Sequence, residues 1–262
     1  MAAGLTAAVG HRAASFLSAG APGAAAVPSG VPGNWERVAR RRVQHFGYRF
    51  DYATRSFGDC LGPLPPQVHA VARRVGSLDS VKQCMDQATA NDYPPGVGLA
   101  AHIDTHYAFT GAIASLSLGS HCCMEFLQGP TPPEPGSRMD SGDAVAVVVA
   151  GSDERDASQR RLLLLPRRSL LIMTGEARYA WRHGILARRT DMVGGAALPR
   201  DRRVSLTLRK VRGFACNCEY PESCDSQSAP LQPTRLALKQ QCQPQPQRLP
   251  LPQQQPPQQQ QP

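Results

Sequence analysis

A histidine and an aspartate stand two residues apart in the sequence AHIDTH at residues 101–106. Side chains two apart in a strand project to the same face, so His102 and Asp104 could share one metal ion. A third ligand must come from elsewhere, and His183 at the end of segment 177–183 is the best candidate. Two histidines and a carboxylate suit non-haem iron(II), because they leave positions open for a cosubstrate and oxygen. We therefore expect an iron(II) site here, although a His-x-Asp triplet also occurs by chance at exposed strand ends.

A pair of arginines strengthens this interpretation. Arg203 and Arg209 lie six residues apart in RVSLTLR, so in a strand both side chains face the same side. A planar guanidinium holds a carboxylate through two parallel hydrogen bonds, which is what a dicarboxylic acid requires. The alternative is a solvated or phosphate-contacting face.

Three cysteines form a second candidate metal site near the end of the folded region. Cys216, Cys218 and Cys224 have the C-x-C-x5-C spacing that is typical of thiolate zinc ligands, and His106 could complete a Cys3His set. The alternative is three ordinary thiols in a loop. The remaining cysteines show no such spacing; we expect Cys122 and Cys123 to lie in a strand, with one of them buried.

The elements that must position these residues are mostly β. Apolar residues at three- and four-residue steps after Pro65-Pro66 predict one helix over residues 67–91. Short apolar or β-branched runs bounded by Gly, Pro, Ser and Asp predict strands at 98–103, 112–118, 122–127, 144–149, 161–165, 169–173, 177–183 and 203–211. Two stretches rich in turn residues, 130–142 and 192–201, are expected to be exposed loops. Eight strands without alternating helices predict a double-stranded β-helix (jelly roll) with a flanking helix.

Composition limits this domain to residues 35–227. Residues 1–34 are rich in Ala, Gly, Ser and Pro, and residues 228–262 are rich in Gln and Pro, so we expect both to be disordered extensions. The first of them also has the acid-poor composition of an organellar transit peptide, which leaves import open beside a cytoplasmic or nuclear location.

Charge and cysteine content bear on partners and compartment. Lys and Arg outnumber Asp and Glu by 29 to 20, and this excess favours a polyanionic partner such as nucleic acid; the alternative is a generally arginine-rich proteome. No apolar run is long enough to cross a bilayer, so no membrane association is expected. Eight cysteines without a signal segment argue against a secreted disulfide scaffold.

The order of motifs resembles that of the AlkB family of iron(II)- and 2-oxoglutarate-dependent dioxygenases. The resemblance covers about residues 40–227 and rests on NDYPPG at 91–96, HIDTH at 102–106, and the segment LPRRSLLIMTGEARYAWRHGI with the two arginines after it. RRVQHFGYRF at 41–50 and CNCEYPESCDSQ at 216–227 are similar to the branch that hydroxylates wobble uridine in tRNA.

The resemblance implies roles for individual residues. It implies iron(II) at His102, Asp104 and His183, and zinc at the Cys3His set. It implies that 2-oxoglutarate is bound by five residues, Asn91, Asp92, Tyr93, Arg203 and Arg209. Of these, Asp92 would contribute only its backbone. The arginine-rich stretch with Arg42, His45 and Tyr48 would belong to a nucleotide-facing lid, although core packing of Tyr48 is an equal alternative.

The activity implied is hydroxylation of 5-methoxycarbonylmethyluridine at the tRNA wobble position, with O2 and 2-oxoglutarate as cosubstrates. Two alternatives stay open: oxidative demethylation of alkylated RNA or DNA bases, and a non-catalytic RNA- or zinc-binding module. Animal members of this branch carry an RNA-recognition motif and a methyltransferase, and we recognise neither here. A separate tRNA methyltransferase is therefore expected to act upstream.

Overall fold

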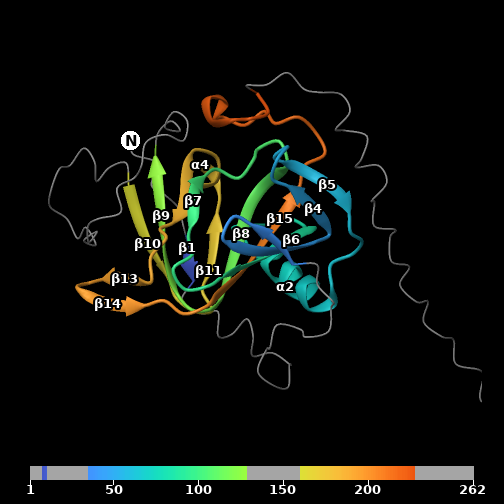
Figure 1. Cartoon of the computed structure of the whole chain (residues 1–262). Coiled ribbons are helices and arrows are strands. Elements are labelled where there is room, and N and C mark those ends of the chain that lie inside the picture. Colours follow the sequence, from blue (N-terminus) through green and yellow to red (C-terminus); the bar gives the residue numbers. More distant parts are fainter. Residues whose placement is uncertain (1–7, 11–34, 129–159, 228–262) are drawn as a thin grey trace, which may run out of the picture.

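The computed structural model describes residues 8–10, 35–128 and 160–227 (Figure 1). Its strands are β1 (Ala8–Gly10), β2 (Glu36–Val38), β3 (Arg41–Phe46), β4 (Tyr48–Asp51), β5 (Ser56–Cys60), β6 (Gln87–Tyr93), β7 (Leu99–His102), β8 (Phe109–Gly119), β9 (Cys122–Gln128), β10 (Arg160–Leu165), β11 (Leu170–Met173), β12 (Trp181–Ile185), β13 (Thr190–Val193), β14 (Ala196–Pro199) and β15 (Arg203–Val211). The helices are α2 (Pro66–Gly76), α4 (Gly175–Tyr179) and the 3-10 turn η1 (Pro221–Ser223).

Two antiparallel sheets form the body of the domain. The larger has the order β1-β11-β8-β15-β6-β3-β2, and the smaller has the order β10-β9-β12-β7. Along the chain, strands β6, β8, β11 and β15 join the larger sheet, while β7, β9, β10 and β12 join the smaller one. Because the chain keeps crossing between the sheets, these eight strands form the double-stranded β-helix that the sequence predicts.

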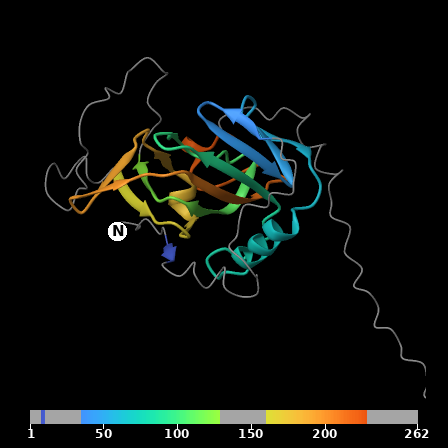
Figure 2. The same ribbon diagram turned by 60° about the horizontal axis from the view of Figure 1, so that its bottom comes forward.

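Two of the three buried clusters lie on opposite faces of the larger sheet. Between the sheets, Ile113, Phe126, Leu171 and Trp181 belong to one buried cluster that draws on strands of both. On the other face, α2 packs against β6, β8, β11 and β15, so the flanking helix is confirmed (Figure 2). Its apolar side chains recur at three- and four-residue steps, which gives the helix one face to bury.

The predicted helix over 67–91 is too long. It ends at Gly76, where a Cβ would stand 2.4 Å from the carbonyl oxygen of Gln83, so the chain folds back tightly on itself there. Residues 87–93 instead form β6, which pairs with β15 on one side and β3 on the other. The apolar spacing continued through Leu78 and Val81, but these two residues pack against the core from the turn after the helix.

Two other predicted segments differ in the structure. The strand over 177–183 begins only at Trp181, because α4 occupies the first residues. The segment 192–201, expected as a loop, contains part of the β13–β14 hairpin, which projects to the left in both overall views (Figures 1 and 2). The predicted strand 144–149 and loop 130–142 lie outside the described residues.

The strands β2 to β5 were not predicted, and they build the sheet edge and a hairpin from residues 36–60. Within the segment expected to be disordered, β1 pairs with β11. Cys122 and Cys123 are both buried, because β9 is covered on both faces at that point, so the expectation of one buried thiol was wrong. In the described part of the chain, no helix has the length and apolar character needed to span a membrane.

Candidate active site

A cavity of about 630 Å³ opens between the two sheets. From the larger sheet, β15 lines it with every second side chain, Arg203, Ser205, Thr207 and Arg209. Leu206 and Leu208, which alternate with them, face the core beneath α2. The strand period of two therefore gives β15 one polar, arginine-bearing face toward the cavity, as the sequence predicts.

The smaller sheet brings the predicted iron ligands together in this cavity. His183 on β12 lies directly opposite His102 on β7, and their ring centroids are 4.6 Å apart. Asp104 follows β7 by two residues, and its Oδ2 lies 3.8 Å from His183 Nε2. One ligand atom from each of these three side chains lies within 4.8 Å of the others, a spacing at which all three could hold one ion.

The protonation states of the three side chains suit a bound cation. His102 Nδ1 lies 2.9 Å from the Ala100 carbonyl oxygen, which can only accept, so Nδ1 carries the proton and Nε2 is left to bind metal. Burial, followed by the proximity of His102, lowers the pKa of His183 to about 3, so this ring is neutral at pH 7. Burial alone would raise the pKa of Asp104, but Arg209 and the two histidines outweigh it and hold the pKa well below its usual range.

Arg209 connects the metal-ligand candidates to a buried polar network. Its Nη2 donates to Asp104 Oδ1 at 3.0 Å, which leaves Oδ2 directed at the histidines. Its Nη1 donates to Gln87 and Thr89, and His45 Nδ1 lies 3.1 Å from the Thr89 hydroxyl. This network fixes the guanidinium at the inner edge of the cavity.

Arg203 stands at the other end of the cavity face of β15. It is buried, donates to the Ser117 hydroxyl at 2.9 Å, and lies over the ring of Tyr93 with 5.5 Å between the guanidinium carbon and the ring centroid. The Nε atoms of Arg203 and Arg209 are both buried without a hydrogen-bond partner. Two guanidiniums on one cavity wall, each with a buried and unpaired Nε, fit a dianionic ligand, because each could donate to one carboxylate. Asn91 lines the same cavity.

The side chain of Asp92 does not face this cavity, which leaves only its backbone for the role predicted in 2-oxoglutarate binding. Asn91 and Tyr93 line the cavity, so the residue between them points to the opposite face of β6. There its buried carboxylate accepts hydrogen bonds from Arg42 and Arg202.

The three predicted lid residues lie in three different environments. Arg42 turns away with Asp92 and covers Trp35. Tyr48 is buried and packs against Phe57 in a third core cluster, so of its two alternatives the structure shows core packing. His45 is buried beside Thr89, and its ring centroid lies 5.9 Å from that of Tyr52.

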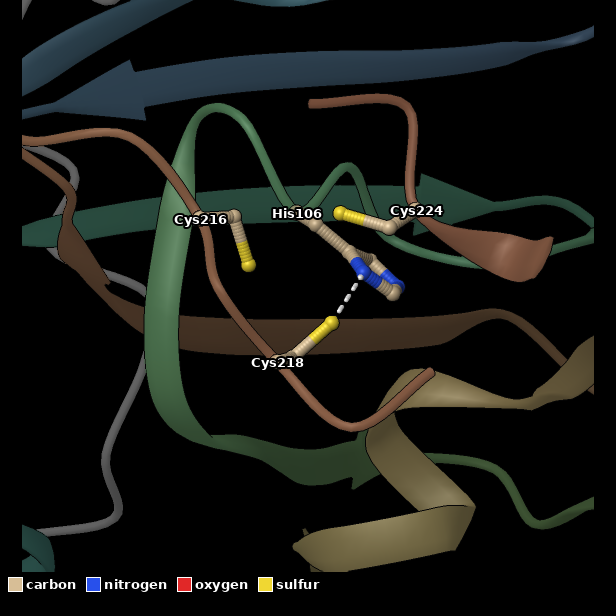
Figure 3. A group of neighbouring side chains, drawn as sticks. All are labelled: His106, Cys216, Cys218 and Cys224. Atoms are coloured by element: carbon tan, nitrogen blue, oxygen red, sulfur yellow. Dashed lines mark hydrogen bonds between the residues drawn. The ribbon is translucent and has the colours of Figure 1, made fainter. Parts of the chain in front are cut away.

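The predicted Cys3His set is also assembled (Figure 3). Its ligand atoms lie within 4.8 Å of one another, with Cys218 Sγ 3.4 Å from His106 Nδ1. Cys216, Cys224 and His106 are buried. The Asp225 carboxylate accepts the backbone N–H groups of His106 and Tyr107, so segment 212–227, which lies at the top of the barrel in Figure 1, is tied to the chain just after Asp104.

Sequence reasoning missed Arg178 of α4, which lies between the two clusters. It is 2% exposed, and its guanidinium donates to the carbonyl oxygens of Asp104 at 2.7 Å, Thr105 at 3.1 Å and Phe109 at 3.3 Å. The neighbouring Tyr179 packs edge-on against His106 at 5.0 Å. An arginine beside an apolar segment gives no sign in the sequence that it is buried among backbone carbonyls.

The cavity mouth has two walls that were also missed. Arg41, Phe50, Tyr52 and Arg55 line one side, and Arg41 lies over the ring of the partly exposed Tyr52. Residues 222–225 of the cysteine-bearing segment line the other side. Aromatic residues interleaved with arginines at 41–55 were the available signal for this wall.

Comparisons with known proteins agree with this geometry. The family model described as "2OG-Fe(II) oxygenase superfamily" matches residues 34–209. The "Alkylated DNA repair protein ALKBH8 homolog" of Arabidopsis thaliana is 43% identical over 205 residues, which are 74% of this chain and 56% of that protein. The "tRNA (carboxymethyluridine(34)-5-O)-methyltransferase ALKBH8" of Macaca fascicularis is 38% identical over 216 residues, 75% of this chain and 28% of that protein.

A human relative named "Alpha-ketoglutarate-dependent dioxygenase alkB homolog 4" is 27% identical over 218 residues, 78% of this chain and 66% of that protein.

The chain spans about half of the Arabidopsis relative and less than a third of the macaque one. The match to the family model covers the β-helix strands and both arginines, and the ALKBH8 relatives match over most of the chain. The chain belongs to the 2OG-Fe(II) oxygenase superfamily and is a dioxygenase that depends on iron(II) and 2-oxoglutarate; over about three quarters of its length it is similar to proteins named ALKBH8.

Proposed function

We propose that His102, Asp104 and His183 hold the iron and that Arg203, Arg209, Asn91 and Tyr93 hold 2-oxoglutarate. The observation that carries this assignment is the direct pairing of His183 with His102 across the cavity from two under-satisfied arginines. Iron(II) with O2 supplies the oxidant, so that a C–H bond becomes C–OH while 2-oxoglutarate loses CO2 and becomes succinate.

The chain's own groups hold the reactants in place and keep bulk water away. Arg209 keeps one oxygen of Asp104 occupied, which directs the other oxygen toward the two histidines. Arg203, buried at the far end of the cavity wall, is placed to bind the distal carboxylate of the cosubstrate. Apolar side chains such as Leu171 and Met173 complete the wall and lower the local dielectric around these charges.

We further propose that the substrate is the wobble uridine of tRNA bearing a 5-methoxycarbonylmethyl group. Relatives that this chain matches over about three quarters of its length are named for the 5-position of uridine 34. The mouth offers Tyr52 as a ring on which a base can stack, with Arg41 and Arg55 beside it for phosphates. An anticodon loop already presents an unstacked base, so the unpairing cost is small.

Mass spectrometry of nucleosides tests this substrate. tRNA carrying the methyl ester is incubated with iron(II), 2-oxoglutarate and the protein, and with the His102→Ala variant as control. The expected result is loss of the ester uridine with gain of its hydroxylated form, in the wild-type reaction alone. Loss of an N-methyl base with the ester uridine untouched would show demethylation instead and overturn the proposal.

We also propose that His106, Cys216, Cys218 and Cys224 bind zinc in a structural role. Tetrahedral zinc with sulfur at about 2.3 Å sets ligand atoms roughly 3.8 Å apart, which is compatible with the observed limit of 4.8 Å. Burial raises the pKa of the Cys216 thiol to about 11, and a bound dication would reverse that effect by stabilising the thiolate.

Metal analysis of the purified protein tests the zinc site. One zinc per chain is expected, and Cys218→Ser should lose it together with several degrees of Tm, because structural zinc contributes directly to folding. Cys84→Ser, at an exposed thiol outside the cluster, is the matched control. Equal zinc content and Tm in wild type and Cys218→Ser would contradict the assignment.

A further inference from the structure

The strand register gathers exposed arginines at the end of the barrel where β15 begins. Arg202 immediately precedes β15, and the turn with Arg167 and Arg168 precedes β11. The backbone N–H of Arg168 donates to the Ser117 carbonyl oxygen, and Ser117 pairs with Ser205 near the start of β15. These segments therefore share one end of the larger sheet.

The β2–β3 hairpin adds further arginines at the same end. Arg42 lies opposite Asp92, which in turn lies opposite Val204 at the start of β15, and Arg37 lies opposite Arg42. Arg40 stands in the hairpin turn beyond them. We call this group the basal rim, defined by its exposed members Arg37, Arg40, Arg42, Arg167, Arg168 and Arg202.

The rim is distinct from the cavity mouth. Arg203 and Arg209 are six residues apart on β15, so the rim lies about 20 Å along the strand from the Asp104 end. From β11 to β2 it crosses five strand spacings, roughly 24 Å. None of its six arginines lines the cavity.

The charge of the rim is mostly unbalanced. Asp92 neutralises part of the charge of Arg42 and Arg202, whose side chains stay 49% and 57% exposed, and Asp201 is the acid next to them. Within the described residues, Arg37, Arg40, Arg167 and Arg168 form no ion pair. Like charges held this close repel one another, which an ordinary solvated face avoids by mixing signs.

We propose that the basal rim is a docking surface for the phosphate backbone of RNA, separate from the catalytic cavity. A row of guanidiniums roughly 24 Å long can contact several successive phosphates, and it reads no sequence. The inference rests on the proposed function in that an RNA substrate has to reach the cavity. A large folded RNA can contact both surfaces.

The test is equilibrium binding of whole tRNA across a series of salt concentrations, with no metal or cosubstrate present. The variant R167S/R168G removes two exposed charges, and glycine suits the φ of 65° at position 168. We expect at least fivefold weaker binding and a log K against log salt slope shallower by about 1.4 to 1.8, at roughly 0.7 to 0.9 per phosphate contact. The matched control, R73A/R74A on α2, should bind as wild type does.

Equal affinity and slope for wild type and R167S/R168G would overturn the proposal, as would equal losses in R73A/R74A. Weaker binding to phosphatidylserine vesicles with unchanged tRNA binding would assign the rim to a membrane surface instead. Succinate formation with a saturating anticodon stem-loop should be unaffected in R167S/R168G. If neither the wild-type protein nor R167S/R168G formed succinate, that result would count against the proposed function. The result of the binding experiment would still stand.

Discussion

Asp104 contacts more of the charged groups around the cavity than its short side chain alone would allow, because its backbone takes part as well. Its carboxylate touches Arg209, its backbone carbonyl accepts from Arg178, and His183 lies 3.8 Å from its second oxygen. A buried carboxylate with a strongly lowered pKa stays ionised and is available to a cation over the whole physiological range of pH.

Replacing Asp104 should weaken metal binding without changing the shape of the cavity. In Asp104→Asn the side chain keeps its shape and loses its charge, so we expect roughly hundredfold weaker binding of Mn(II), used as an air-stable substitute for iron(II). Calorimetric titration in the presence of 2-oxoglutarate measures the change. Asp201→Asn, at an exposed acid, is the control and should bind as wild type does. Unchanged affinity in Asp104→Asn would remove this residue from the ligand set.

Arg203 should act on the cosubstrate through its shape as well as its charge. Lysine cannot donate two parallel hydrogen bonds to a carboxylate, so in Arg203→Lys we expect the KM for 2-oxoglutarate to rise roughly 10- to 100-fold. Arg202→Lys, one residue earlier and facing outward, should leave that KM unchanged. A similar rise in both variants would indicate a general charge effect.

His45 should make the fold sensitive to acid. Burial first, and then the charge of Arg209, lowers its pKa from 6.5 to about 4, so the unfolded chain binds more protons between these two values. Stability is therefore lost as pH falls from about 6.5 toward 4. In His45→Gln, which can still hydrogen-bond Thr89, urea unfolding at pH 5 and 7 should show an acid-induced loss smaller by on the order of 1 to 2 kcal/mol. An identical loss in both proteins would contradict this assignment.

At the scale of elements, α4 holds the loop that bears Asp104 and His106. Arg178 supplies donors to three carbonyl oxygens of residues 104–109, and these donors cannot be replaced by water in so buried a position. We expect Arg178→Lys to lower the free energy of unfolding by about 3 kcal/mol and to weaken Mn(II) binding. Denaturant unfolding and metal titration, with the exposed Arg73→Lys as control, measure both effects. If Arg178→Lys lowered the free energy of unfolding but bound Mn(II) as tightly as wild type, Arg178 would contribute to stability and not to metal binding.

The sequence predicts those elements whose own pattern decides their structure. Strands such as β9, β11 and β15 are apolar or β-branched runs with clear turn residues at their ends, and they form where expected. β6 has the sequence QATANDY, with little apolar character, and its strand structure depends on pairing with β15 and β3 on either side. No local pattern could show that pairing, so the apolar spacing before it extended the predicted helix too far.

The candidate site divides in the same way. Arg203 and Arg209 could be placed on one face because a period of two determines the face of a strand. His102 and Asp104 also come together, although Asp104 lies beyond the end of β7. The direction of the Asp92 side chain could not be predicted from a motif: its neighbours line the cavity, while its carboxylate pairs with Arg42 and Arg202 behind the sheet. Arg178 required the three-dimensional contacts, since its partners are backbone carbonyls more than 60 residues away.

At the scale of the whole molecule, the cavity and the basal rim are two separate surfaces of the β-helix. The cavity is lined by the metal-ligand candidates and by residues 222–225, and none of the six rim arginines lines it. We propose the first surface for chemistry on one base and the second for contact with the phosphate backbone. Variants at the two surfaces should therefore have additive effects on turnover of whole tRNA.

If the paired histidines and Asp104 form the iron centre of a 2-oxoglutarate-dependent enzyme, the protein must release succinate. The most direct measurement is succinate formed from 2-oxoglutarate with iron(II), O2 and tRNA, compared between wild type and His102→Ala. We expect succinate from the wild-type protein, abolished by omitting iron and reduced to background in His102→Ala. Equal succinate from the two proteins, or none from the iron-loaded wild type with any tRNA, would contradict the assignment of this iron centre.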